Sequence, residues 1–173
     1  MVVIRDWQRG LDGCPSASCA FIQMHGKAST TCPNDTVFLS SGLGIYLHFF
    51  LPEMVQYLTN RSLGNANSSI LWYQDSVDRP VKRIKSKLKL AFPGWPGAVS
   101  LPSDSGCDLT ATRNVGGRHI NNVPLTSVCT VGATPSGATG QFVHIEQASE
   151  ARLAANYALW SQAELDSFAP AAA

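Results

Sequence analysis

The chain has 173 residues, of which 45% are apolar, and its mean hydropathy is zero. It is therefore long enough to bury a core, and its composition excludes disorder of the whole chain. Only 14% of the residues are charged, and Gly, Ser, Thr, Pro and Asn recur every ten or so positions, a pattern typical of many short strands. The formal net charge is +1, but six of the 13 basic residues and none of the 12 acids lie within 79–89.

The first predicted region, 1–59, contains three of the five cysteines in the spacing C-x4-C-x12-C. His25 lies between them, which allows a zinc site to be considered, but the paired C-x2-C of zinc knuckles is absent and we predict no metal and no cofactor. Disulfides are the alternative, with Cys14–Cys32 and Cys107–Cys129 as candidate pairs and one thiol left over. Plain buried thiols remain a second alternative.

Three N-x-S/T sequons begin at Asn34, Asn60 and Asn67 and are candidate glycosylation sites. Together with the cysteines they favour an extracellular or lumenal location. The N-terminal residues MVVIRDWQRGLDG do not form a signal peptide, because their apolar run is three residues long. Either a leader has been removed, or the chain is intracellular and the sequons are unused.

An apolar run at 36–52, TVFLSSGLGIYLHFFLP, carries no charged residue. As a helix it would be about 26 Å long, slightly less than the roughly 30 Å of a hydrocarbon core. We therefore predict a buried strand pair or a core helix. A membrane span, and with it a membrane-associated location, is the alternative.

The basic stretch alternates between apolar and charged residues, with Ile84 and Leu88 on one parity and Lys85 and Lys87 on the other. Period two predicts a half-buried strand with a charged outer face. That face is either a solvated edge that prevents aggregation or a surface that contacts an anion. The candidate anion contacts are Arg79, Lys82, Arg83, Lys85, Lys87 and Lys89.

A loop rich in Pro and Gly follows and carries Trp95, which is either a ligand contact or a plug over the core. The densest polar cluster lies at 112–122 and can grip a sugar or a carboxylate through guanidinium and amide groups. A solvated turn is the alternative. The candidate ligand-binding residues are Trp95, Arg113, Arg118, His119, Asn121 and Asn122.

The C-terminal part predicts one further strand and a helix. Val143 and Ile145 alternate with Phe142, His144 and Glu146, which is the period of a strand. The segment SEARLAANYALWSQAELDSF is rich in helix formers and predicts a short helix. Residues 169–173 are expected to be a tail.

Motifs of catalysis are absent from the sequence. It has no phosphate-binding loop, no G-x-S-x-G and no H-E-x-x-H, and the four histidines are scattered. Basic residues without interleaved aromatic platforms do not favour nucleic acid. We therefore predict a protein that is not an enzyme and does not bind nucleic acid.

The segment ILWYQDSVDRPVKRIK at 70–85 resembles the tryptophan-containing strand of discoidin-like (coagulation-factor type C) domains. NNVPLTSVCTVGATPSGATGQFVHIEQ resembles a segment that these domains share with fucolectins, although the Arg-x-Asp-Cys-Cys element of the fucose site is absent. Over 60–168 the resemblance implies an antiparallel, jelly-roll-like β-sandwich that binds glycans, anionic lipids or proteins through loops at one end.

We therefore expect a mainly β fold with a short C-terminal helix, in which 1–59 and 60–168 form one domain. The expected function is a non-enzymatic binding or adhesion module for a glycan, an anionic surface or a protein partner. The alternative is an accessory subunit of a larger, membrane-bound assembly.

Overall fold

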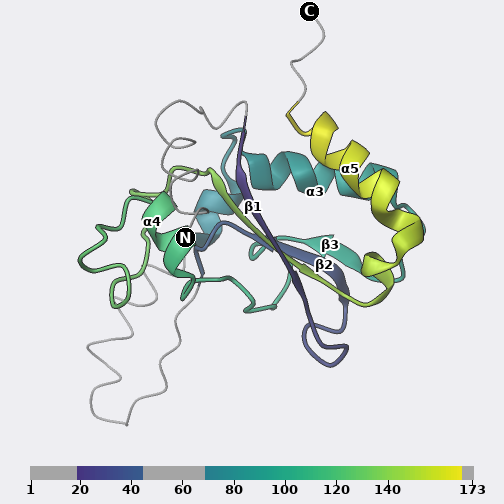
Figure 1. The fold of residues 1–173 in the computed structure, drawn as a ribbon, viewed down its shortest axis with the longest axis horizontal. Coiled ribbons are helices and arrows are strands. Elements are labelled where there is room, and N and C mark those ends of the chain that lie inside the picture. Colours follow the sequence, from purple (N-terminus) through teal and green to yellow (C-terminus); the bar gives the residue numbers. More distant parts are fainter. Residues whose placement is uncertain (1–18, 45–68, 169–173) are drawn as a thin grey trace, which may run out of the picture.

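The computed structural model describes residues 19–44 and 69–168 (Figure 1). Residues 69–74 are helical. The other elements, in chain order, are β1 (Phe21–Gly26), β2 (Asp35–Ser40), α3 (Pro80–Ala91), β3 (Ala98–Ser100), α4 (Val115–Ile120), β4 (Phe142–Gln147), two 3-10 turns (Glu150–Arg152 and Ala154–Asn156) and α5 (Tyr157–Asp166).

The strands form one open mixed sheet in the order β1-β4-β2-β3. β1 is parallel to β4, β2 is antiparallel to β4, and β3 is parallel to β2. Parallel neighbours need a long crossover connection, and α3 lies in the chain between β2 and β3. The expected antiparallel β-sandwich is therefore wrong, because the described residues form an α/β fold with a single sheet.

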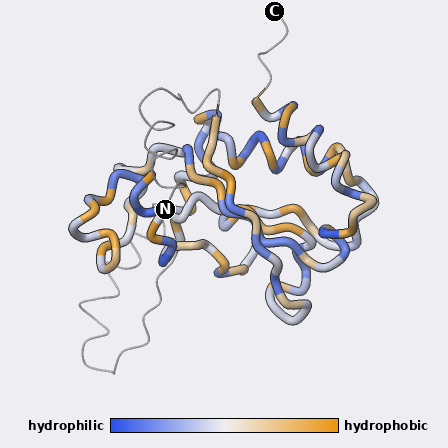
Figure 2. Tube along the Cα trace, in the orientation of Figure 1, coloured by the Kyte–Doolittle hydropathy of each residue, from blue (hydrophilic) through white to orange (hydrophobic). Residues whose placement is uncertain are grey.

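The sheet has two different faces. On β4, Val143 and Ile145 point into the hydrophobic core, while His144 and Glu146 point to the opposite side, as the period of a strand requires. The strand predicted from this alternation is confirmed. Figure 1 shows α3 and α5 side by side over the core face, and Figure 2 shows hydrophobic positions along the central strands.

α4 lies against the other face of the sheet. A Cβ on Gly117 would come within 2.5 Å of the Phe142 ring, so only glycine lets this helix pack so closely on β4. Asn114 caps the helix, because its side chain accepts a hydrogen bond from the Gly117 amide. The 112–122 segment is thereby fixed beside the side of β4 that carries His144.

The predicted basic strand is wrong, because 80–91 forms α3. Val81, Ile84 and Leu88 are fully buried, at the i, i+3, i+7 spacing of one helix face, whereas Leu90 is 75% exposed. Pro80 occupies the first turn, where its fixed φ favours helix and its missing N–H is not needed. Ile84, Leu88 and Leu90 all lie on the apolar parity of the alternating pattern, but only the first two are buried.

Most of the basic residues at 79–89 pair with acids rather than forming a bare cationic face. Arg79 and Lys82 both pair with Asp75. Arg83 and Lys85 pair with Asp78 and Asp104. The role of these side chains as anion contacts stays a prediction, but four of the six carry an internal partner.

Lowering the pH should weaken the pair between Asp75 and Arg79. Hydrogen bonds from Arg79 hold the pKa of Asp75 well below its usual range, so its contribution to stability is present above about pH 4, the unfolded value, and is lost as the pH falls further. We expect Asp75→Asn to lower the free energy of unfolding at pH 7 by about 0.5–1 kcal/mol. The difference from wild type should shrink towards pH 2 in urea titrations. The more exposed Asp78→Asn serves as control, and an equal loss in both variants would contradict the assignment.

The cysteine pairing also differs from the prediction. Cys32 is bonded to Cys107, so both candidate pairs, Cys14–Cys32 and Cys107–Cys129, are wrong. Cys129 is free and exposed, and Cys19 is disulfide-bonded. The observed bond joins the connection between β1 and β2 to the loop after β3, a contact that spacing along the chain does not reveal.

Of the apolar run, the described part is the buried strand β2 and the turn that follows it. Residues 45–52 lie outside the described residues, as do Asn60 and Asn67, whereas Asn34 is exposed. No helix in the described ranges is long and apolar enough to cross a membrane. Both predicted regions, 1–59 and 60–168, contribute strands to the sheet.

Candidate functional site

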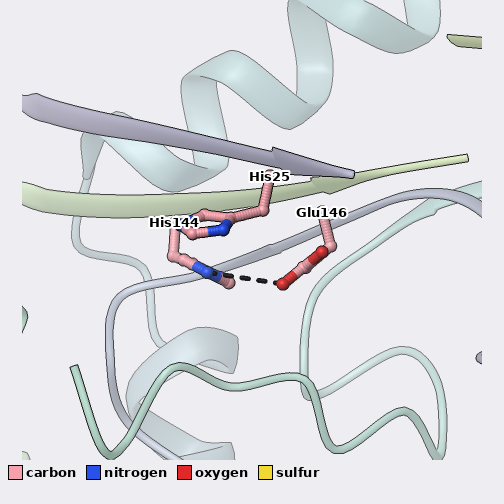
Figure 3. A group of neighbouring side chains, drawn as sticks. All are labelled: His25, His144 and Glu146. Carbon is pink, nitrogen blue, oxygen red and sulfur yellow. Dashed lines mark ion pairs between the residues drawn. The ribbon is translucent and has the colours of Figure 1, made fainter. Parts of the chain in front are cut away.

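Three titratable side chains meet on the face of the sheet opposite the core. His25 of β1 is the register partner of Glu146 of β4, and His144 lies two residues before Glu146. Paired residues of parallel strands share a face, and so do residues i and i+2 of one strand. Figure 3 accordingly shows all three side chains on the same side of the two strands.

The distances within this group, the His25–His144–Glu146 cluster, are short. His144 Nε2 lies 3.5 Å from Glu146 Oε1, and the rings of His25 and His144 are 4.8 Å apart between centroids (Figure 3). His144 is 6% exposed, whereas His25 is exposed. The cluster thus has a buried part on β4 and an accessible part on β1.

Burial shifts the pKa of both cluster residues on β4, His144 and Glu146. It lowers the pKa of His144 to about 4, and the nearby His25 acts in the same direction. Burial also raises the pKa of Glu146, against the opposing influence of His25 and Lys27. His144 is consequently neutral at neutral pH, and its Nδ1 is buried without a hydrogen-bond partner among the described residues.

The loop at 102–114 faces the cluster from the other side. The Cys32–Cys107 disulfide anchors it to the turn just before β2, and Ser105 Oγ donates to the buried Asp35 at 3.0 Å. At its far end, the Asn114 side chain donates to Gln23 on β1. The loop is therefore tied to the sheet at both ends.

Between the loop and the strands lies a cavity of about 670 Å³. His25, His144 and Glu146 line one side of it, and Asp108, Arg113 and Asn114 contribute from the loop. Ile70, Pro102 and Leu109 add apolar surface. A concave site with a few convergent polar groups on a partly apolar wall is typical of small-molecule binding.

The predicted polar cluster separates into two groups in the structure. Arg113 and Asn114 line the cavity. Arg118 and Asn121 are buried and hold backbone: Arg118 donates to the carbonyls of Thr112 and Val128, and Asn121 donates to that of Ser41. Neither lines the cavity, although the bond from Arg118 holds Thr112, which does.

The remaining candidates lie elsewhere. Asn122 has φ of 65° and donates to the Gly137 carbonyl, which suits the turn interpretation. His119 is on α4 and does not line the cavity. Trp95 stacks on Phe92 with ring centroids 4.0 Å apart and packs against the core with Trp160, as a plug over the core would.

Sequence analysis missed His144 and Glu146 as site residues. The H-x-E pattern within a strand was a usable signal, because it places an imidazole and a carboxylate on one face. The position of His25 beside these two residues could not be predicted, because it depends on the pairing of β1 with β4, which are more than a hundred residues apart in the chain.

The cluster also has the composition of a metal site. Its three potential ligand atoms all lie within 4.8 Å of one another. Two imidazoles and one carboxylate form a donor set used by zinc and by non-haem iron. A second group, Cys32, Asp35 and Cys107, is close enough, but its two sulfurs are bonded to each other and offer no thiolate.

Comparisons with protein-family models, curated proteins and solved structures found no match for this chain. They therefore do not bear on the resemblance to discoidin-like domains. The function has to be inferred from the chemistry of the cavity itself.

Proposed function

We propose that the chain is an extracellular or lumenal binding module that takes a sugar residue of a glycan in the cavity between β1, β4 and the 102–114 loop. The observation that carries the proposal is the cavity itself, whose volume of about 670 Å³ suits a small ligand. Its loop is covalently anchored by a disulfide, a bond typical of oxidising compartments.

The lining supports an oxygen-rich ligand. Sugar hydroxyls both donate and accept hydrogen bonds, and the cavity offers carboxylates from Asp108 and Glu146 together with the guanidinium group of Arg113. The apolar surfaces of Ile70 and Leu109 can pack against the C–H face of a sugar ring. We thus keep the expected role as a glycan-binding module, on a different fold and with Arg113 as the one predicted ligand-binding residue that lines the cavity.

A glycan array of neutral and acidic glycans tests the proposal, with a variant that fills the cavity. Gly106 lines the cavity, and a Cβ added there meets nothing within 4 Å, so Gly106→Trp should fold and obstruct the site. Gly94 is equally unobstructed but does not line the cavity, which makes Gly94→Trp the matched control.

We expect the wild type and Gly94→Trp to bind the same subset of glycans, and Gly106→Trp to lose at least about tenfold in affinity, or 1.4 kcal/mol. Near-ultraviolet circular dichroism should show that all three proteins are folded. An array without any bound glycan, or binding that Gly106→Trp leaves intact, would contradict the proposal.

A further inference from the structure

We propose that His25, His144 and Glu146 bind one divalent transition-metal ion of the zinc type on the sheet side of the cavity. The inference deepens the proposed function and rests on it in one respect only, namely that the ion would contact the bound sugar. The metal site itself stands on the geometry of the cluster.

The register of the sheet supplies that geometry. β1 and β4 present the three side chains on one face, from adjacent parallel strands, and all three line the same cavity. A tetrahedral zinc ion with ligand bonds of about 2.1 Å separates its ligand atoms by about 3.4 Å. The 3.5 Å between His144 Nε2 and Glu146 Oε1 already matches this spacing.

The third ligand requires only a small movement. The widest separation within the cluster is 4.8 Å at most, so closing it takes roughly 1.4 Å. His25 is exposed and lies on β1, at the end of the sheet order, so its side chain can rotate towards the other two. The inner two ligands are held by burial on β4 and do not have to move.

The donor set indicates which ion fits. Imidazole nitrogen with a single carboxylate suits zinc, cobalt and nickel, whereas magnesium and calcium prefer sites made entirely of oxygen. With one carboxylate, a bound divalent ion leaves a net charge of +1 on the site. The fourth ligand of a tetrahedral ion would come from the cavity, and the positive charge would then favour the carboxylate of an acidic sugar.

Calorimetric titration with zinc tests the site. The protein is produced without a polyhistidine tag, and a chelator removes any bound metal beforehand. We expect one zinc ion per chain, and cobalt in its place should give the intense visible absorption of a four-coordinate ion. His25→Ala and Glu146→Gln should each weaken zinc binding at least about tenfold. These two residues are less buried than His144, so their replacement should leave the fold intact.

Two variants control for binding elsewhere. His119→Ala removes a histidine that does not line the cavity, and Cys129→Ser removes the free, exposed thiol. Both should bind zinc as the wild type does. Absence of zinc binding, or binding that His25→Ala and Glu146→Gln leave unchanged, would overturn the metal site.

The metal proposal and the sugar proposal can fail separately. Stripped and zinc-loaded chain are compared on the same glycan array, and loading should raise binding to acidic glycans over neutral ones. Sugar binding by a chain that takes up no zinc would overturn the metal site and leave the proposed function standing. Zinc uptake at the cluster without any glycan binding would uphold the metal site and overturn the proposed function.

Discussion

Replacing both Cys32 and Cys107 by serine is expected to lower the free energy of unfolding by about 4 kcal/mol. The bond closes a loop of 75 residues between β2 and the segment after β3, and the entropy that a crosslink removes from the unfolded chain grows with loop length. In a chain of this size, that loss corresponds to a fall in Tm of roughly 10 °C.

The same variant should also weaken the candidate site. Cys107 belongs to the cavity lining, and the disulfide holds the 102–114 loop near the sheet together with the hydrogen bonds of Ser105 and Asn114. Urea titrations at pH 7 measure the stability, with Cys129→Ser as the control because that thiol is free and exposed. Equal stability of the double variant and the control would show that the Cys32–Cys107 bond is absent or unimportant.

Replacing Ser86 by proline should cost about 3 kcal/mol or more, because Ser86 is in the middle of α3. Proline removes the amide that bonds to the carbonyl one turn earlier and places its ring against it. Ser86 is exposed, so the loss cannot come from core packing. Ser86→Ala is the matched control and should be neutral or slightly stabilising, since alanine has the higher helix propensity.

This pair of variants decides between the helix and the strand that the alternating pattern suggested. Thermal unfolding followed by far-ultraviolet circular dichroism gives the comparison. A Ser86→Pro protein as stable as Ser86→Ala, with unchanged helical signal, would contradict α3.

The parts of the fold that sequence predicted are those governed by local burial. Val143 and Ile145 alternate with polar residues because one side of β4 is core, and the C-terminal helix is present as α5. The uncharged run at 36–40 is a strand buried on both faces, as its composition indicated.

The main error, a strand predicted at 80–91, arose because the same residues fit both a strand and a helix pattern. In 80–91, Ile84 and Leu88 satisfy both a period of two and a helical spacing, and Pro80 and the exposed Leu90 decide for the helix. A strand there, together with many turn residues, favoured a mainly β fold, and the resemblance to discoidin-like domains implied the sandwich. In the structure, the turn residues connect strands with helices as well as strands with strands.

The candidate site was the hardest to predict, because its parts are distant in sequence. Arg113 was chosen for its polar neighbours and does line the cavity, whereas its neighbours Arg118 and Asn121 are structural. The disulfide pairing and the meeting of His25 with Glu146 depend on strand register. No local pattern encodes either.

The measurement that tests the central claim most directly is an amide chemical-shift titration of the labelled, zinc-loaded chain with the terminal sugar of the strongest array ligand. The account predicts shifts confined to His25, to 144–146 and to the 105–114 loop, and their loss in Gly106→Trp. Shifts that cluster instead on α3 or on the exposed side of α5, with the cavity unaffected, would contradict it.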